Sequence, residues 1–210
     1  MTTADLKSIQ ELQLLIKYGC DLLLALLLLI PVICVVLLLG VILYCDSPGP
    51  VFFRQLRPGR NGKLFAIYKL RTMAPGDHTR ETPRNQDGSL ALTADLAGYT
   101  RFGRLLRRFS LDELPQIFNI IKGEMSFIGP RPDLPEHLDL YTAAESMKLA
   151  VRPGLTGLAQ IAGRNELPWK ERLKLDVQYV KEYNLWLDLK ILAGTMGKII
   201  SGKGIYAPKQ

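Results

Sequence analysis

The hydrophobic pattern separates an apolar N-terminal segment from a mixed remainder. Residues 22–43 contain no charged side chain and consist mainly of Leu, Val and Ile. A helix of this length measures about 33 Å, enough to cross a hydrocarbon layer of roughly 30 Å. Residues 1–21 are amphipathic, with apolar positions at helical spacing. They predict either a helix on a membrane surface or the first turns of the apolar helix.

Pro31 lies near the middle of the apolar segment. Proline lacks an amide hydrogen, so we expect a kink there. Basic residues occur both before the segment, at Lys7 and Lys17, and after it, at Arg54 and Arg57. A single span usually has its basic residues on one side, whereas both flanks of a re-entrant helix lie in the same compartment. The residues alone leave a spanning and a re-entrant helix open.

Two β-rich runs follow, at residues 51–56 and 63–71, around Pro-Gly and Asn-Gly turns. They predict a β-hairpin. Period-2 alternation places Lys69 at the outer end of a face that mixes apolar and basic residues. This end could meet an anion or remain a solvated strand edge. Residues 74–98 lack periodicity and predict a long mobile loop.

The rest of the chain is predicted to be mostly helical. Apolar periodicity predicts helices over the ranges 99–109, 136–149, 169–183 and 185–200, and a short one near 110. Residues 151–165 are punctuated by glycine and predict turns with short extended pieces. The last helix carries Trp186 and an apolar stripe that could pack in a core or lie at a membrane interface. The fold class is therefore α+β, mostly helical, with one hairpin.

Charge narrows the possible partners. The chain has 27 Lys and Arg against 20 Asp and Glu, a net charge of +7. This excess favours lipid head groups, nucleic acid or a phosphorylated metabolite. The basic residues alternate with acidic ones and with Gly/Pro turns, which argues against nucleic acid. Three cysteines and two histidines make a zinc site improbable, and we expect Cys20, Cys34 and Cys45 to be small buried hydrophobes.

Two adjacent carboxylates, Asp112 and Glu113, open the predicted short helix. Ser110 and Glu113 have capping-box spacing, which would be a purely structural role. The helix dipole also keeps an aspartate ionised and able to act as a nucleophile. Neighbouring helical residues point about 100° apart, so one carboxylate could attack while the other helps to hold Mg²⁺. The pair does not suit a glycosidase, whose carboxylates flank a sugar.

Cations surround these carboxylates in the sequence. Four arginines precede them, at positions 101, 104, 107 and 108. Arg131 follows within a Gly-Pro-Arg-Pro turn, where the proline rings restrict the backbone and could pre-organise a guanidinium for phosphate. An incidental surface turn is the alternative. Arg164 has a similar but weaker case. Cations beside ionised carboxylates indicate phosphate chemistry.

Several motifs, in this order, resemble the bacterial sugar transferase family, the monotopic polyprenyl-phosphate phosphoglycosyl transferases. The resemblance runs from about residue 15 to residue 195. The motifs that carry it are the Pro-broken apolar helix, Arg-Pro-Gly at 57–59, Lys-Leu-Arg-Thr-Met at 69–73, Ser-Leu-Asp-Glu-Leu-Pro at 110–115, Met-Ser-Phe-Ile-Gly-Pro-Arg-Pro at 125–132, Arg-Pro-Gly-Leu-Thr-Gly at 152–157 and Gly-Arg-Asn at 163–165.

The resemblance implies a two-step transfer. A UDP-sugar would give its sugar-1-phosphate to Asp112 and release UMP, and undecaprenyl phosphate would then accept the phosphosugar. Glu113 matches a Mg²⁺-associated carboxylate, and Asp176 matches a family carboxylate of less defined role. The positions that match residues around the diphosphate or nucleotide are Lys69, Arg107, Arg131 and Arg164.

The resemblance also implies a location. Residues 1–45 would form a re-entrant membrane helix, and residues 46–210 a catalytic domain on the cytoplasmic face of a bacterial inner membrane. The family often has Ser-Pro where this chain has Ile30 and Pro31, so the kink depends on proline alone. The 74–98 loop looks long for the family and could carry sugar specificity. The residues leave two alternatives, a membrane-anchored basic binding module and a spanning scaffold; oligomeric state is open.

Overall fold

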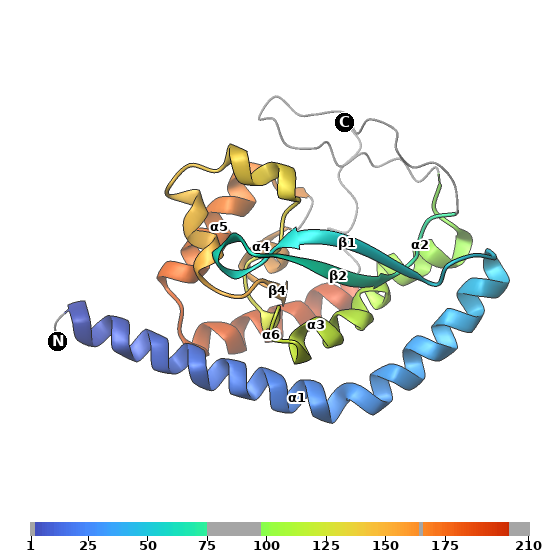
Figure 1. Cartoon of the computed structure of the whole chain (residues 1–210), viewed down its shortest axis with the longest axis horizontal. Helices are drawn as coiled ribbons and strands as arrows, with labels where there is room; N and C mark the ends of the chain where they lie inside the picture. Colours follow the sequence, from blue (N-terminus) through green and yellow to red (C-terminus); the bar gives the residue numbers. More distant parts are fainter. Residues whose placement is uncertain (1–2, 75–97, 164–165, 202–210) are drawn as a thin grey trace.

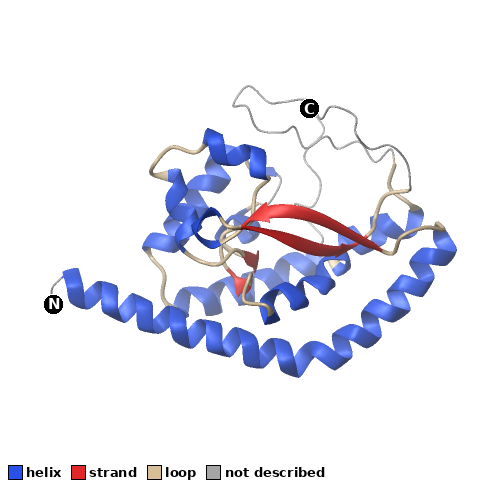
Figure 2. Ribbon diagram, viewed as in Figure 1, coloured by secondary structure: helices blue, strands red, loops and turns tan. Residues whose placement is uncertain are grey.

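The structure is a computed structural model that describes residues 3–74, 98–163 and 166–201. Helices surround two small two-stranded sheets, so the predicted α+β class is confirmed (Figure 2). The α-helices are α1 Thr3–Asp46, α2 Arg101–Arg108, α3 Ile117–Ile121, α4 Leu158–Ala162, α5 Trp169–Lys181 and α6 Leu185–Ser201. The strands are β1 Phe52–Pro58, β2 Leu64–Leu70, β3 Ser126–Ile128 and β4 Gly154–Thr156. Short 3₁₀ segments are η1 Arg60–Gly62, η2 Leu111–Gln116, η3 Pro135–Leu140 and η4 Glu145–Ala150.

Helix α1 is one continuous element that contains Pro31. The amphipathic N-terminal residues are therefore the first turns of the apolar helix, one of the two predicted alternatives. Figure 1 shows α1 bent near its middle, as expected where proline removes a helical hydrogen bond. Within the described residues, it is the one helix long and apolar enough to cross a membrane. Leu27 and Ile30 are 75% and 73% exposed, which is not the environment of a soluble core helix.

The inner face of α1 packs along the rest of the protein. Its middle contributes Ala25 to a buried cluster with residues of β2 and α3. Nearer its C-terminal end, Leu43 is fully buried in a cluster with Leu70 and Leu106. Nearer its N-terminal end, the buried Lys17 forms an ion pair of 2.8 Å with Asp188 of α6. Both arms of the bent helix therefore contact the same domain.

The cysteine prediction is wrong. Cys20, Cys34 and Cys45 are free thiols, and all three are exposed. They lie on α1, where much of the helix surface is not covered by protein. An apolar sequence run indicates burial from water, but it does not say whether protein or lipid provides the cover.

The predicted hairpin is confirmed. Strands β1 and β2 are antiparallel, from Phe52 opposite Leu70 to Pro58 opposite Leu64. Between them, Asn61 and Gly62 adopt left-handed backbone conformations with φ of 56° and 75°, which explains the Asn-Gly sequence. The predicted mobile loop lies almost entirely outside the described residues. At its ends, the amide of Ala74 donates to the carbonyl of Gly98 at 2.7 Å.

The parallel pairing of β3 with β4 was not predicted. Each strand has only three residues, too few for a detectable alternation. The pairing requires close backbone contact, since a Cβ on Gly154 would lie 2.0 Å from the amide nitrogen of Gly129. The amide of Gly154 also donates to the carbonyl of Pro130 at 2.9 Å. This sheet therefore anchors the turn that carries Arg131.

Two other predictions need correction. The helix expected over 136–149 is split into η3 and η4, because Tyr141 leaves the helical conformation. Segment 151–165, expected to form turns and extended pieces, contains helix α4 after β4. The predicted helices that correspond to α2, α5 and α6 are confirmed. In α6, Ile191 is fully buried and Trp186 is 64% exposed, so the helix has both a core-packed side and an exposed apolar side.

Candidate active site

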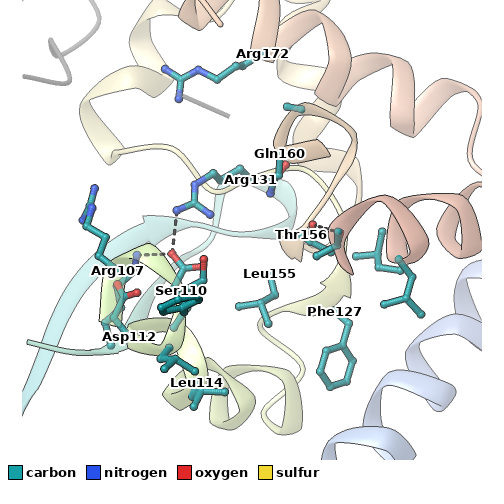
Figure 3. A pocket seen from close by; sticks show the side chains of 18 of the residues that line it. Arg107, Ser110, Asp112, Leu114, Phe127, Arg131, Leu155, Thr156, Gln160 and Arg172 are labelled. Atoms are coloured by element: carbon teal, nitrogen blue, oxygen red, sulfur yellow. Dashed lines mark hydrogen bonds and ion pairs between the residues drawn. The ribbon is translucent and has the colours of Figure 1, made fainter. Parts of the chain in front are cut away.

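A cavity of about 410 Å³ lies among η2, β3, β4, α4, α5 and α6 (Figure 3). Its lining is polar on one side and apolar on another. Arg107, Asp112 and Arg131 belong to the polar part, while Phe127 and Leu155 belong to the apolar part. Residues that the sequence marked as candidates for catalysis and binding therefore line one cavity.

Segment η2 presents the two carboxylates. It is preceded by Ser110, whose left-handed backbone has φ 56° and ψ 21° and whose side chain makes no capping hydrogen bond. The capping box expected between Ser110 and Glu113 is therefore wrong. The Glu113 carboxylate instead forms ion pairs with Lys69 and Arg131. An ionised carboxylate gains more from two cations than from one backbone amide.

Glu113 accepts two charge-assisted hydrogen bonds on the same oxygen. Its Oε1 lies 2.7 Å from Lys69 Nζ and 2.9 Å from Arg131 Nη2. Burial alone would raise the pKa of Glu113, but the positive charges of Arg131 and Lys69 outweigh it and hold the pKa well below its usual range. Glu113 is therefore ionised throughout the physiological pH range.

Asp112, one residue earlier, has the opposite electrostatics. Its side chain lies in the cavity wall, and the residue is only 4% exposed. Burial, followed by the negative charge of Glu113, raises the pKa of Asp112 to about 6, against the opposing effect of Lys69 and Arg107. At pH 7 the carboxylate is mostly ionised, yet it is more basic than an ordinary aspartate. That combination suits a nucleophile.

Arg131 is held by the turn between its two prolines. Arg57 Nη1 donates to the carbonyl of Pro132 at 3.3 Å, and β4 supports the turn from the other side. The Arg131 side chain remains 41% exposed although it pairs with Glu113. Part of its guanidinium can therefore contact a second anion, as the Gly-Pro-Arg-Pro motif led us to expect.

A second ionic cluster adjoins this turn. The buried Lys148 lies 2.8 Å from both Asp133 and Asp176, and Asp133 also accepts bonds from Tyr141 and Trp169. Burial opposes ionisation of Asp133, but Lys148 and its hydrogen bond hold the pKa of Asp133 well below its usual range. Burial raises the pKa of Asp176 despite Lys148. One oxygen of Asp176, Oδ1, is buried without a hydrogen-bond partner.

The structure collects nearly all of the predicted site residues around one cavity. The residues that line it are Lys69, Arg107, Asp112, Glu113, Arg131 and Asp176. Arg107 also stacks over the ring of Tyr99, with its guanidinium carbon 5.2 Å from the ring centre. Arg164 lies outside the described residues. Six positions from four separate parts of the chain therefore converge, which the sequence motifs alone did not require.

Sequence reasoning missed other polar residues in or beside the cavity. Asp133 directly follows the Gly-Pro-Arg-Pro motif, a position that could have drawn attention to it. Lys148 was placed in a long amphipathic helix, where a lysine indicates a solvated face. Gln160 and Arg172 also line the cavity. Gln160 fell in a segment predicted to form turns, so its inward direction on α4 could not be seen.

The carboxylate pair has the chemistry of a partial Mg²⁺ site. Among the described residues, no group of three or more His, Cys, Asp or Glu could hold a metal ion. Mg²⁺, however, often binds through one or two carboxylates and completes its shell with water and substrate phosphates. Both contacts of Glu113 use Oε1, so Oε2 remains as a potential ligand atom beside Asp112. The pair therefore fits a site that a diphosphate would complete.

The apolar side of the cavity continues onto an exposed surface of α6. Leu192 and Met196 line the cavity and are 48% and 55% exposed. Trp186 and Leu189, on the same helix, are also exposed. A cavity lined by arginines therefore also borders an exposed apolar face, an arrangement that suits an amphipathic ligand.

The chain is similar to known proteins over most of its length. The family model described as bacterial sugar transferase matches residues 12–202. An uncharacterized sugar transferase, EpsL, from Bacillus subtilis is 45% identical over 157 residues, which cover 75% of this chain and 73% of the relative. A UDP-glucose:undecaprenyl-phosphate glucose-1-phosphate transferase from Caulobacter vibrioides is 40% identical over 179 residues, covering 81% and 64%.

A third relative shows that the shared part can belong to a longer protein. The galactosyl transferase CpsE from Streptococcus agalactiae is 37% identical over 161 residues, which cover 74% of this chain but 36% of the relative. The family match includes every residue that lines the cavity. The chain belongs to the bacterial sugar transferase family.

Proposed function

We propose that this protein transfers a sugar-1-phosphate from a UDP-sugar to undecaprenyl phosphate through a covalent intermediate on Asp112. The observation that carries the proposal is the buried, basic carboxylate of Asp112 beside the cations Lys69 and Arg131, in a cavity that opens onto an apolar face. The names of the Caulobacter relative and of an undecaprenyl-phosphate glucose phosphotransferase from Komagataeibacter xylinus support the substrate classes.

In the first step, a carboxylate oxygen of Asp112 attacks the phosphorus atom that carries the sugar. The bond from that phosphorus to the bridging diphosphate oxygen breaks, and UMP leaves with the electron pair. In the second step, a phosphate oxygen of the polyprenyl phosphate attacks the same phosphorus. The acyl-phosphate bond breaks and the Asp112 carboxylate is regenerated. No proton needs to be gained or lost, which fits a nucleophile that is already ionised at pH 7.

The cations would stabilise the charge that develops on the phosphoryl oxygens. Arg131 can approach through the exposed part of its guanidinium, and Arg107 lines the same wall. Lys69 holds Glu113 in place through their 2.7 Å contact. Glu113 would hold Mg²⁺ together with the diphosphate, which leaves Asp112 to attack; when bound, the ion would neutralise charge on the diphosphate oxygens.

We infer a monotopic location on the cytoplasmic face of a bacterial inner membrane. The support is geometric, because both arms of α1 contact one domain, at Lys17 and at Leu43. A helix that crossed the membrane would place its two ends about 30 Å apart on opposite sides. In the monotopic arrangement, the bent helix α1 would instead enter one leaflet and return to the same membrane surface. Its exposed apolar side would contact the lipid. Tags at the two termini should then be modified from the same side; modification from opposite sides would contradict this topology.

The reaction can be tested with the full-length protein in lipid nanodiscs. A panel of UDP-sugars that begins with UDP-glucose should release about one UMP per enzyme when no lipid acceptor is present. Addition of undecaprenyl phosphate should convert this burst into steady turnover, and chelation of divalent metal should stop both. Turnover with both substrates but no burst without the acceptor would contradict the two-step scheme. Turnover in excess chelator would remove the metal from the proposal.

A further inference from the structure

We propose that Gln160 and Asp176 form a subsite for a hydroxyl-bearing sugar ring of the donor substrate. This inference rests on the proposed function, since it takes the donor to be a nucleotide sugar. The two residues come from neighbouring helices, α4 and α5, and both line the cavity. In the view of Figure 3, Gln160 lies on the side of Arg131, away from Phe127.

The first argument is the state of the Gln160 carboxamide. Gln160 is 4% exposed, yet neither its Nε2 nor its Oε1 has a hydrogen-bond partner. Of the buried side chains with unpartnered polar atoms in the described part of the chain, Gln160 is the one with two such atoms. Proteins rarely leave both ends of a buried amide unbonded, because burial without a partner lowers stability. A ligand that supplies both bonds would explain why glutamine is present.

A comparison with Gln116 sharpens this argument. Gln116 is also buried, at 2% exposed, and its Nε2 also lacks a partner. Gln116 does not line the cavity, whereas Gln160 does. A carboxamide in the cavity wall is placed to meet a ligand. Asp176, which also lines the cavity, adds a third unpartnered atom, its buried Oδ1, while its Oδ2 pairs with Lys148.

The hydrogen-bond donors and acceptors of Gln160 and Asp176 indicate the chemistry of the ligand. Gln160 offers one donor group and one acceptor, while the Asp176 carboxylate offers only acceptor atoms. Adjacent hydroxyls on a sugar ring can both donate and accept, so they can satisfy all of these atoms. A uracil ring has a single N–H donor, at N3, between two carbonyl acceptors, so it could bond the Gln160 carboxamide but would have no donor left for the Asp176 carboxylate. The shared chemistry is a ring with neighbouring hydroxyls, which both the transferred hexose and the ribose of UDP carry.

The remaining walls of the cavity are already assigned by their chemistry. Arg131 and Arg107 suit the diphosphate, and the surface of Leu192 and Met196 suits the polyprenyl chain. Gln160 and Asp176 also line the cavity; a fully ionised phosphate cannot donate to the acceptor atoms of either residue, and an isoprenoid offers them no polar atom. A ring attached to the diphosphate could reach this wall while phosphorus remains beside Asp112.

The test uses Gln160→Leu in the full-length protein in nanodiscs, with UDP-glucose as the probe. Leucine removes both hydrogen-bonding atoms at similar volume, so a purely structural glutamine without partners predicts equal or higher thermal stability. The subsite predicts in addition a fall in kcat/KM for UDP-glucose of about 10- to 100-fold, mainly through KM. The matched control is Gln178→Leu on the exposed face of α5, which should leave kcat/KM unchanged.

Deoxy analogues identify which ring is bound. UDP-glucose that lacks a hydroxyl on the hexose, or on C2 of the ribose, is compared in both proteins. The analogue that lacks the recognised hydroxyl should lose kcat/KM in the wild type but lose little more in Gln160→Leu, because the partner is already gone. Equal losses in the two proteins for every analogue, or an unchanged kcat/KM for UDP-glucose in Gln160→Leu, would overturn the subsite.

Calorimetric binding separates this inference from the proposed reaction. The wild type should bind UDP-glucose, and Gln160→Leu should bind it about 10-fold more weakly or worse. Dependence of binding on Gln160 without any UMP release or lipid product would support the subsite and contradict the reaction. Normal transfer with equal UDP-glucose binding in both proteins would support the reaction and contradict the subsite.

Discussion

Two carboxylate clusters border the cavity, and each places two nearby acids beside cations. The clusters differ in how the cations pair with the acids. In the first, Lys69 and Arg131 pair with Glu113 and only act on Asp112 through their charge; in the second, Asp133 and Asp176 share Lys148. Each cluster has one carboxylate with a lowered pKa, Glu113 or Asp133, and one with a raised pKa, Asp112 or Asp176. The cations pair most closely with one acid of the first cluster and with both acids of the second.

The difference lies in what remains available for a substrate. The Lys148 side chain is 3% exposed and contacts both of its carboxylates, so that cluster is closed around its cation. The Arg131 side chain is 41% exposed, and neither cation of the first cluster forms an ion pair with Asp112. The cations of the first cluster can therefore contact a phosphate. Lys148 cannot, because it is enclosed by Asp133 and Asp176, and only the unpartnered Oδ1 of Asp176 remains at the cavity. In the proposed reaction the first cluster reacts, and Asp133 of the second cluster holds the end of the turn that carries Arg131.

Asp112→Asn should have the largest effect on activity. Loss of the nucleophile should reduce UMP release by about 10⁴-fold or more, measured as burst and turnover with the preferred UDP-sugar. Stability should be unchanged or higher, because the raised pKa shows that the fold disfavours the charged form. The matched control is Asp139→Asn at an exposed position, which should alter neither quantity. Turnover of Asp112→Asn at the wild-type rate would show that the first cluster does not carry the reaction.

Lys148→Met should have the largest effect on stability. It leaves Asp133 and Asp176 buried without their shared cation, which should lower the free energy of unfolding by about 3–5 kcal/mol in denaturant titration. Lys181→Met, at an exposed position on α5, should change it by less than about 0.5 kcal/mol.

A second substitution checks the cause. Adding Asp176→Asn to Lys148→Met should recover part of the lost stability, because one uncompensated charge is removed. A loss from Lys148→Met no larger than that from the exposed control would mean that the second cluster is not a structural ion network.

Arg131→Lys should reduce kcat/KM for the UDP-sugar by about 10- to 100-fold. Lysine retains the positive charge, but it lacks the planar guanidinium group that can hydrogen-bond Glu113 and a phosphate at the same time. Arg131→Ala should reduce it further, by about 10²- to 10³-fold. Arg101→Lys, at an exposed position on α2, is the control for a general arginine effect. Equal activities for the lysine variant and the wild type would show that charge alone is required.

The pH dependence of the first step should show the smallest of these effects. A nucleophilic carboxylate with a pKa of about 6 must be ionised, so kcat/KM should fall as the pH decreases through about 6. The same sign applies to stability: protonation of Asp112 relieves a buried charge, so its destabilising contribution is present above pH 6 and decreases below it. A kcat/KM that stays constant down to pH 4.5 would show that Asp112 behaves as an ordinary exposed aspartate.

The sequence predicted much of this protein for local reasons. The apolar run with Pro31, the Asn-Gly hairpin and the apolar stripes of α2, α5 and α6 depend on periodicity and turn chemistry that a short window contains. The motif residues around Asp112 were also identified, through resemblance to a family. The parallel pairing of β3 with β4 was not, because it joins residues 126–128 to residues 154–156 and neither run is long enough to show a pattern.

Two capping-box patterns show where local information ends. Ser110 and Glu113 have the required spacing, but their side chains do not cap. Thr142 and Glu145 have the same spacing, and they do form the reciprocal bonds, at 2.8 and 3.2 Å. Glu145 also contacts Lys170 and still reaches the amide of Thr142. The spacing of the two residues therefore does not separate the two cases.

The sequence alone determined which chemical groups are present and which segments are helical, apolar or turn-forming. Tertiary structure decided what each group does. It brought Lys69 and Arg131 to one oxygen of Glu113, so the expected cap is instead a charged neighbour of Asp112. Burial, followed by this charge, raises the pKa of Asp112. It also placed Gln160 in the cavity wall, where its carboxamide atoms have no hydrogen-bond partner. The physical reason is that long-range ionic contacts and burial outweigh a local hydrogen bond to the backbone.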